Sequence, residues 1–348
     1  MSLIPGASLI ILATTTVAIG AKVAAAREEQ NLETDEFVEI NCTQVILMPV
    51  CSSISLLVLF FFFDYAQLFL LLITVAGSVY ILFDLCYNAI QSIRPTLNWK
   101  LNMLLAVVFS GIVFVEWLKS NYIAHDILGC AMCITLIGIL RFPSLKIAFL
   151  SLCLLVVYDI FWVFYSEYFF NANVMTTVAT KQASNPVQSF GSHYNIQTLK
   201  ALKPTVELPM KLMVPAEGSH YSMLGLGDIA LPGLLVALAL RSDKLLKQEL
   251  PTAVESGKFD NLGLLPDLGQ NKFPKNIKVG EFYFFELSLA GYFFGMIMAF
   301  YANKVTKLAQ PALIYLVPGV LIPFVLRAFQ KGKLAEVWAG PKQEAAKS

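Results

Sequence analysis

The chain has 348 residues, of which 57% are hydrophobic and 14% charged, and its formal net charge is +1. Soluble domains are ordinarily about 45–50% apolar, so this composition, with a mean hydropathy of +0.66, excludes an ordinary soluble domain. No basic stripe with interleaved aromatic residues is present, and we expect no nucleic-acid partner.

Apolar stretches of about 20 residues follow one another along the chain, which predicts an all-α polytopic membrane protein. The whole chain, 1–348, is expected to form one membrane-embedded domain. Within it, 1–166 would hold spans one to six, 167–220 a loop, and 221–348 spans seven to nine and a tail. The nine spans are predicted at about 5–26, 44–63, 66–88, 102–118, 121–140, 144–166, 221–241, 280–302 and 308–330.

Positively charged residues in the short loops predict the orientation, because Lys and Arg are enriched on the cytosolic side. The bias favours a luminal N-terminus and a cytosolic C-terminus. In this orientation the cytosolic side receives Arg94, Lys100, Arg141, Lys146, Arg241, Lys244, Lys247, Arg327, Lys331 and Lys333, against Lys119, Lys304 and Lys307 on the other side. Residues 167–220 are then luminal.

The glycosylation sequon Asn41-Cys42-Thr43 tests this orientation. It lies in the loop 27–43, which is rich in acidic residues and is predicted to be cytosolic. Since N-linked glycans mark secreted or luminal loops, we expect Asn41 to carry none, so that glycosidase treatment leaves the protein's electrophoretic mobility unchanged. A mobility shift that Asn41→Gln abolishes would contradict the predicted orientation.

Two aspartates lie in otherwise apolar spans, Asp159 in 144–166 and Asp228 in 221–241. An Asp at the centre of a membrane helix costs about 3 kcal/mol on translocon scales, so it marks a functional site by default. Each Asp lies about seven residues from the predicted luminal end of its span, which is roughly 10 Å at 1.5 Å per residue. Two carboxylates at one depth on antiparallel neighbours can meet.

Two adjacent carboxylates cannot both ionise cheaply, so one keeps a proton while the other acts as a base. That is the chemistry of aspartic proteolysis, in which one carboxylate activates water and the other polarises the scissile carbonyl. Gly225 and Gly227 leave the backbone before Asp228 bare for another chain to approach. Pro311 and Pro318 predict an irregular start to the last span at the same end.

Other interpretations of these aspartates remain open at this point. They could bind protons or ions in a proton-coupled transporter, although the two halves of the chain share no repeated pattern of broken helices. They could also belong to an inactive scaffold that binds membrane helices. The chain has three histidines and no HExxH motif, so a zinc protease is excluded. We expect no metal or cofactor, and we interpret Cys130 and Cys133 as packing residues.

Three short strings resemble the YD, GxGD and PAL motifs of the intramembrane aspartyl proteases, a group that comprises presenilins and signal peptide peptidases. The strings are Tyr158-Asp159, Gly225-Leu226-Gly227-Asp228 and Gln310-Pro311-Ala312-Leu313. The resemblance implies a presenilin and signal peptide peptidase-like fold, with Asp159 and Asp228 catalytic. It also implies substrate-binding roles for Tyr158, Gly225, Leu226, Gly227, Gln310, Pro311, Ala312 and Leu313.

Two longer strings resemble the signal peptide peptidase side: Tyr158–Phe164 (YDIFWVF) and the PAL string followed by Tyr315–Pro318 (YLVP). Within that side, four strings resemble the signal peptide peptidase-like 3 branch. They are Phe60–Asp64 (FFFFD), Arg141–Lys146 (RFPSLK), Asn173–Thr180 (NVMTTVAT) and Gly218–Asp228 (GSHYSMLGLGD). The resemblance implies a Golgi protease that cuts type II single-span membrane proteins, glycosyltransferases among them, and releases their ectodomains.

The implied partners are therefore such substrates and the lipid bilayer. The final residues, AAKS, lack a dilysine retrieval signal, which favours the Golgi over the endoplasmic reticulum. The alternative function is cleavage of remnant signal peptides, as by signal peptide peptidase itself. Self-association into a homo-oligomer is left open.

Overall fold

The computed structural model describes residues 4–30, 38–181, 205–215, 221–255, 283–306 and 310–340, with short pieces between 183 and 197. Several predicted features lie wholly or partly outside these ranges: the loops 167–220 and 242–279, the starts of the spans at 280 and 308, Gly218 to His220, and the final AAKS. Residues 31–37 of the acidic loop also lie outside them.

Long helices account for most of the described chain. Its first half contains α1 (Ile4–Gln30), α2 (Cys42–Ile93), α3 (Trp99–Leu118) and α4 (Tyr122–Ile139). Its second half contains α5 (Leu145–Ile160), the π-helix η1 (Phe161–Tyr165), α6 (Ser166–Phe170), α7 (Val174–Thr180), α10 (Leu226–Glu255), α11 (Phe284–Thr306), α12 (Leu313–Gln330) and α13 (Leu334–Ala339).

Seven of the described helical segments are long and apolar enough to cross a membrane: α1, α2, α3, α4, the continuous α5–α6 segment, α11 and α12. The helix α10 is also long, but Asp228, Arg241 and Asp243 interrupt its apolar sequence. The prediction of an all-α polytopic membrane protein is confirmed.

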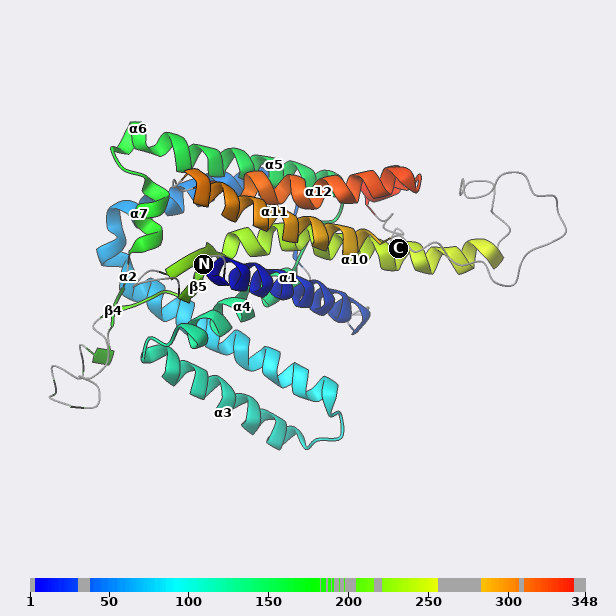
Figure 1. The fold of residues 1–348 in the computed structure, drawn as a ribbon. Coiled ribbons are helices and arrows are strands. Elements are labelled where there is room, and N and C mark those ends of the chain that lie inside the picture. Colours follow the sequence, from blue (N-terminus) through cyan, green and yellow to red (C-terminus); the bar gives the residue numbers. More distant parts are fainter. Residues whose placement is uncertain are drawn as a thin grey trace.

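The helix α2 contains two of the predicted spans. Its 52 residues would extend about 78 Å at 1.5 Å per residue, far more than the ~30 Å of a bilayer core. The backbone is not helical at Phe62 (φ −119°, ψ 21°), where two helical stretches meet at a kink. Figure 1 shows α2 changing direction at the left of the molecule. Near the kink the Lys181 Nζ donates a hydrogen bond to the Phe60 carbonyl at 3.1 Å, so this backbone oxygen has a hydrogen-bond partner. The kink falls at the predicted boundary between 44–63 and 66–88.

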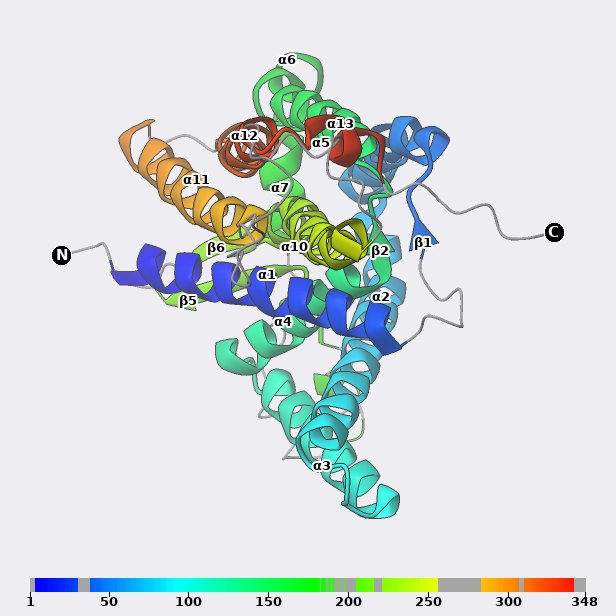
Figure 2. The ribbon, with the colours of Figure 1, turned by 90° about the vertical axis from the view of Figure 1, so that its right-hand side faces the viewer.

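The helix α10 lies at the centre of the bundle. It packs against α1, α4, α5, α11 and α12, and Figure 2 looks nearly along it, with the neighbouring helices around it. Leu235, Val236 and Ala239 of α10 are completely buried. Because this helix also carries Asp228, the site is attached to a helix that packs against five others.

Short strands lie between the helices. The pair β1 (Val38–Glu39) and β2 (Leu140–Arg141) is parallel, and β3 (Ala183–Ser184) pairs antiparallel with β4 (Thr205–Val206). The longest pair is the antiparallel hairpin of β5 (Lys211–Pro215) and β6 (Tyr221–Gly225). The prediction that the seventh span begins at 221 is therefore wrong, since 221–225 is a strand. Pairing with β5 satisfies this backbone as a helix would, and Gly225 and Gly227 disfavour an earlier helix start.

Side chains from neighbouring helices fix the starts of the last two long helices. Both carboxylate oxygens of Asp243 in α10 accept hydrogen bonds at the start of α11, from the N–H groups of Phe284 at 3.1 Å and Phe285 at 2.9 Å. The start of α12 is capped by Asp159, as described below. The helix α12 begins at Leu313, five residues after the predicted start at 308.

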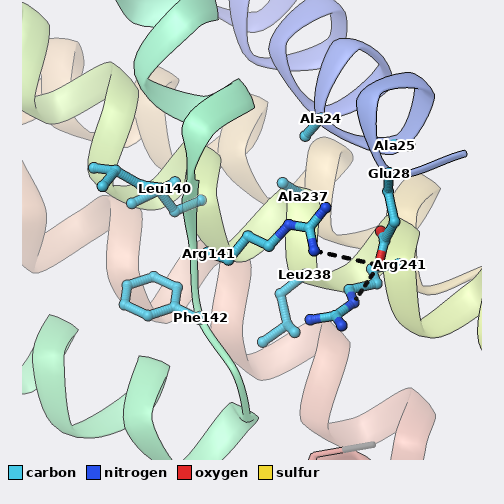
Figure 3. A pocket seen from close by; sticks show the side chains of 10 residues that line it. Ala24, Ala25, Glu28, Leu140, Arg141, Phe142, Ala237, Leu238 and Arg241 are labelled. Carbon is cyan, nitrogen blue, oxygen red and sulfur yellow. Dashed lines mark ion pairs between the residues drawn. The ribbon is translucent and has the colours of Figure 1, made fainter. Parts of the chain in front are cut away.

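Near the middle of α10, an ion-pair cluster joins α1, β2 and α10 (Figure 3). The Glu28 Oε1 lies 2.9 Å from the Arg241 Nε and 3.6 Å from the Arg141 Nη1. The small pocket beside them has a volume of about 20 Å³. Arg241 follows Asp228 by 13 residues, or about 20 Å along the helix, so this cluster is separate from the aspartate site.

Candidate active site

Asp159 lies in the last turn of α5 and is 3% exposed. Its Oδ2 accepts a hydrogen bond from the backbone N–H of Leu313 at 3.3 Å. Leu313 is the first residue of α12, where backbone N–H groups have no partner within the helix and the helix dipole stabilises negative charge. The carboxylate of Asp159 therefore joins the end of α5 to the start of α12.

The helix that carries Asp159 changes type immediately afterwards. Phe161–Tyr165 form the π-helix η1, an irregularity that is frequent at functional sites. Its carbonyls are paired with side chains: the Asn173 Nδ2 donates to the Val163 oxygen at 2.8 Å, and the Ser166 Oγ donates to the Trp162 oxygen at 2.6 Å. The Trp162 Nε1 also donates to the Ser53 Oγ of α2 at 3.0 Å. These contacts fix the backbone that follows Asp159.

Asp228 lies where the hairpin becomes a helix. The strand β6 ends at Gly225 and α10 begins at Leu226, whose N–H donates to the Met210 carbonyl at 3.2 Å. Asp228 is half-buried. Its own carbonyl accepts a hydrogen bond from the Tyr292 hydroxyl of α11 at 3.4 Å, so strand pairing and a buried tyrosine both hold this turn.

The structure brings the two aspartates into one site. The helices α5, α10 and α12 pack against one another, and Asp159 lies near enough to Asp228 for the two carboxyl groups to interact electrostatically. Within a low-dielectric interior, two negative charges at close range repel strongly. Two carboxyl groups in such surroundings favour a state in which one of them keeps its proton.

The glycines of the GLGD string have different surroundings. A Cβ on Gly225 would lie 3.4 Å from the Asp228 Oδ2, in ordinary contact, whereas a Cβ on Gly227 would meet nothing within 4 Å. Both glycines are exposed, while Leu226 between them is buried. The backbone on either side of Leu226 therefore has no side chain to cover it near the Asp228 carboxylate.

The remaining predicted site residues belong to the YD and PAL strings. Tyr158 is half-buried, and its ring centroid lies 6.4 Å from that of Trp162. The side chain of Gln310 binds two neighbouring residues: its Oε1 accepts from the Tyr315 hydroxyl at 3.5 Å and its Nε2 donates to the Thr306 Oγ1 at 3.1 Å. In the segment that follows, Pro311 and Leu313 are buried and Ala312 is partly exposed.

Three residues near the site were not predicted from the sequence. Tyr292 gave no signal, because an aromatic residue in an apolar helix is ordinary. His125 and Asp126 did give one: they are adjacent ionisable residues in an apolar helix, and the rule that singled out Asp159 applies to them equally. Both side chains bind the hairpin that leads to Asp228.

Fold and site together define a class: a multi-pass membrane protein with an aspartate pair between its helices. Comparison with known proteins identifies the family. Residues 32–344 match the sequence profile described as signal peptide peptidase. The chain belongs to this family, and it is an intramembrane-cleaving aspartic endopeptidase.

Individual relatives refine this result. The signal peptide peptidase-like 1 protein of Oryza sativa subsp. japonica is 33% identical over 97% of this chain and 94% of its own length. Its namesake in Arabidopsis thaliana is 31% identical over 97% and 93%. The rice protein named signal peptide peptidase-like 3 is 28% identical over 87% of this chain and 52% of its own length. These values support the family and do not favour the predicted branch.

Proposed function

We propose that Asp159 and Asp228 are the catalytic pair, and that the enzyme hydrolyses peptide bonds in or near the membrane-spanning segments of its substrates. The observation that supports this most directly is the placement of Asp159 at the N-terminus of α12, within electrostatic reach of Asp228. The Leu313 N–H and the helix dipole stabilise a negative charge on Asp159. Asp159 is thus the base that activates water, and Asp228 holds the shared proton and polarises the scissile carbonyl.

The hairpin offers a way to present the substrate. Within the described sheet β6 pairs with β5 alone. The Leu226 N–H donates to the Met210 carbonyl, so in the register of the hairpin the backbone groups of Leu224 and Ser222 face β5. Backbone groups of alternate residues point to opposite edges of a strand, so those of Met223 and Gly225 face the open edge. An extended peptide can add a strand to such an edge. It would then lie within a few residues of Asp228.

For the substrate class we propose type II single-span membrane proteins, Golgi glycosyltransferases among them, with release of their ectodomains. This rests on the strings that resemble the signal peptide peptidase-like 3 branch, and with it we propose Golgi residence and a luminal N-terminus. Cleavage of remnant signal peptides is the second candidate, because relatives such as the mouse protein are named signal peptide peptidase.

Purified protein in mild detergent, incubated with one type II substrate and one signal-peptide substrate, distinguishes the two. Each reaction is run with and without a transition-state-mimicking aspartyl protease inhibitor. Inhibitor-sensitive cleavage of the type II substrate alone is the expected result. Cleavage of the signal peptide alone would reverse the substrate assignment, and the absence of cleavage in both would contradict the proposed function.

The segment Pro311-Ala312-Leu313 gives a further prediction. We propose that it lines the substrate cleft beside Asp159, where Ala312 is partly exposed and Leu313 is buried. Ala312→Leu should therefore obstruct the site and lower kcat/KM by about tenfold or more, without loss of expression. Leu313→Ala keeps the N–H that binds Asp159 but leaves a cavity beneath it, and we expect a similar loss.

Initial cleavage rates of a defined substrate measure both effects. The matched control is Ala302→Leu, because Ala302 is also partly exposed but lies in α11. It should cleave at the wild-type rate. Full activity in both Ala312→Leu and Leu313→Ala would show that the segment is only a structural support.

A further inference from the structure

The helix α4 presents two adjacent buried polar side chains to the hairpin. His125 is 3% exposed and Asp126 is 7% exposed, both in the first turns of an otherwise apolar helix. The His125 Nε2 lies 2.8 Å from the Lys211 carbonyl oxygen. The Asp126 Oδ1 accepts a hydrogen bond from the Met213 N–H, also at 2.8 Å. Both partners belong to β5.

The two partners are alternate residues of that strand. The Lys211 carbonyl and the Met213 N–H are bound to α4, so they face the outer edge of β5, and the backbone groups of Leu212 between them face β6. His125 and Asp126 therefore bind the outer edge of β5 as a third strand would. Apolar packing alone is non-directional, whereas these hydrogen bonds join specific backbone atoms and so fix the register of the hairpin against α4.

The same face of α4 also contacts the part of the chain that joins the hairpin to Asp228. A Cβ on Gly129 would lie 3.0 Å from the Leu212 Cδ2 and 3.3 Å from the Leu226 Cδ2, so the missing side chain lets both leucines approach. One turn further, the Cys133 Sγ lies 3.7 Å from the Leu226 carbonyl oxygen. Leu226 precedes Asp228 by two residues.

We propose that His125 and Asp126 are positioning residues of the protease. By fixing the register of the β5–β6 hairpin on α4, they set where Asp228 stands relative to Asp159. Because they occupy the outer edge of β5, they also leave β6 as the edge at which an extended substrate adds. The inference rests on the proposed function, since it concerns the placement of the proposed catalytic pair and of the substrate strand.

To test this role, variants that remove these hydrogen bonds are compared with variants that keep them. Asp126→Ala and His125→Leu remove them. Asp126→Asn keeps an acceptor oxygen, and His125→Gln keeps a donor N–H, for the same backbone partners. The matched control is Thr135→Val, which removes a buried hydroxyl from the same helix. For each protein kcat, KM, thermal stability in detergent and the cleavage position in a defined substrate are measured.

We expect Asp126→Ala and His125→Leu to lower kcat by about tenfold or more and to cut at several neighbouring bonds, while melting close to Thr135→Val. Asp126→Asn and His125→Gln should restore the single wild-type cleavage position and most of kcat. A purely structural role would lower stability and leave the cleavage position unchanged.

Three results would overturn the inference: wild-type kcat and cleavage position in both removal variants, failure of the conservative variants to restore them, or loss of the folded protein in both removal variants. The last would mean that the pair stabilises the fold as a whole. Asp159→Asn and Asp228→Asn, measured alongside, separate this failure from that of the proposed function. If these two variants still cleave, the proposed function is wrong whatever His125 and Asp126 do.

Discussion

Asp159→Asn and Asp228→Asn are each expected to abolish cleavage. Asparagine has nearly the same shape as aspartate but can neither act as the base nor share a proton, so each substitution removes the chemistry while keeping the packing. The amide introduced by Asp159→Asn would still offer an oxygen to the Leu313 N–H, which in the native protein binds the Asp159 Oδ2 at 3.3 Å. Thermal stability and substrate binding should therefore remain close to those of the wild type.

The double variant should be no less active than either single one, because the two groups act as a unit. For the same reason the pH–rate profile of the wild type should be bell-shaped, with both limbs belonging to the pair. Asp64→Asn, which changes an exposed carboxylate in α2, is the control and should retain full activity. Substantial cleavage by either single variant would remove that aspartate from the mechanism.

The sequence predicted the helices and the aspartate pair because both leave strong signals. Apolar runs of membrane length are nearly unambiguous, and an acidic residue inside one, such as Asp159, is costly enough to stand out. The spans at 44–63 and 66–88 were predicted as two, and the structure joins them in one helix kinked at Phe62.

The hairpin before Asp228 could not be predicted in the same way. The strands β5 and β6 have five residues each, too few for a period to emerge, and their stability depends on pairing with each other and with α4. The helix α4 is distant from the hairpin along the chain, since Asp126 and Met213 are 87 positions apart. His125 and Asp126 could have been identified as functional, but their hydrogen-bond partners in the hairpin could not.

The close approach of α11 and α12 was also not predicted, and it carries the second large effect. A Cβ on Gly295 of α11 would lie 2.8 Å from the Tyr315 carbonyl oxygen and 3.2 Å from the Leu316 Cα. Both atoms belong to the backbone of the first turns of α12, so no side chain can move aside to make room. Overpacking of this kind costs about 1–3 kcal/mol.

Gly295→Ala should therefore push the start of α12 away from α11. Because Leu313 lies in that first turn, the hydrogen bond that its N–H donates to Asp159 should lengthen or break. We expect kcat/KM to fall by about tenfold or more, together with a fall of a few degrees in the melting temperature in detergent. Cleavage kinetics and thermal unfolding of the same preparation measure both.

Gly111→Ala is the matched control, because Gly111 lies within the membrane helix α3 and a Cβ there would meet nothing within 4 Å. Alanine favours a helix over glycine by about 1 kcal/mol, so this variant should melt at or slightly above the wild-type temperature and cleave at the wild-type rate. Both variants gain the helix preference of alanine, but only Gly295→Ala adds a close contact with α12. The difference between them therefore measures the effect of that contact. Equal activity in the two variants would show that the start of α12 tolerates displacement, and that the Leu313 N–H does not hold Asp159 in its working position.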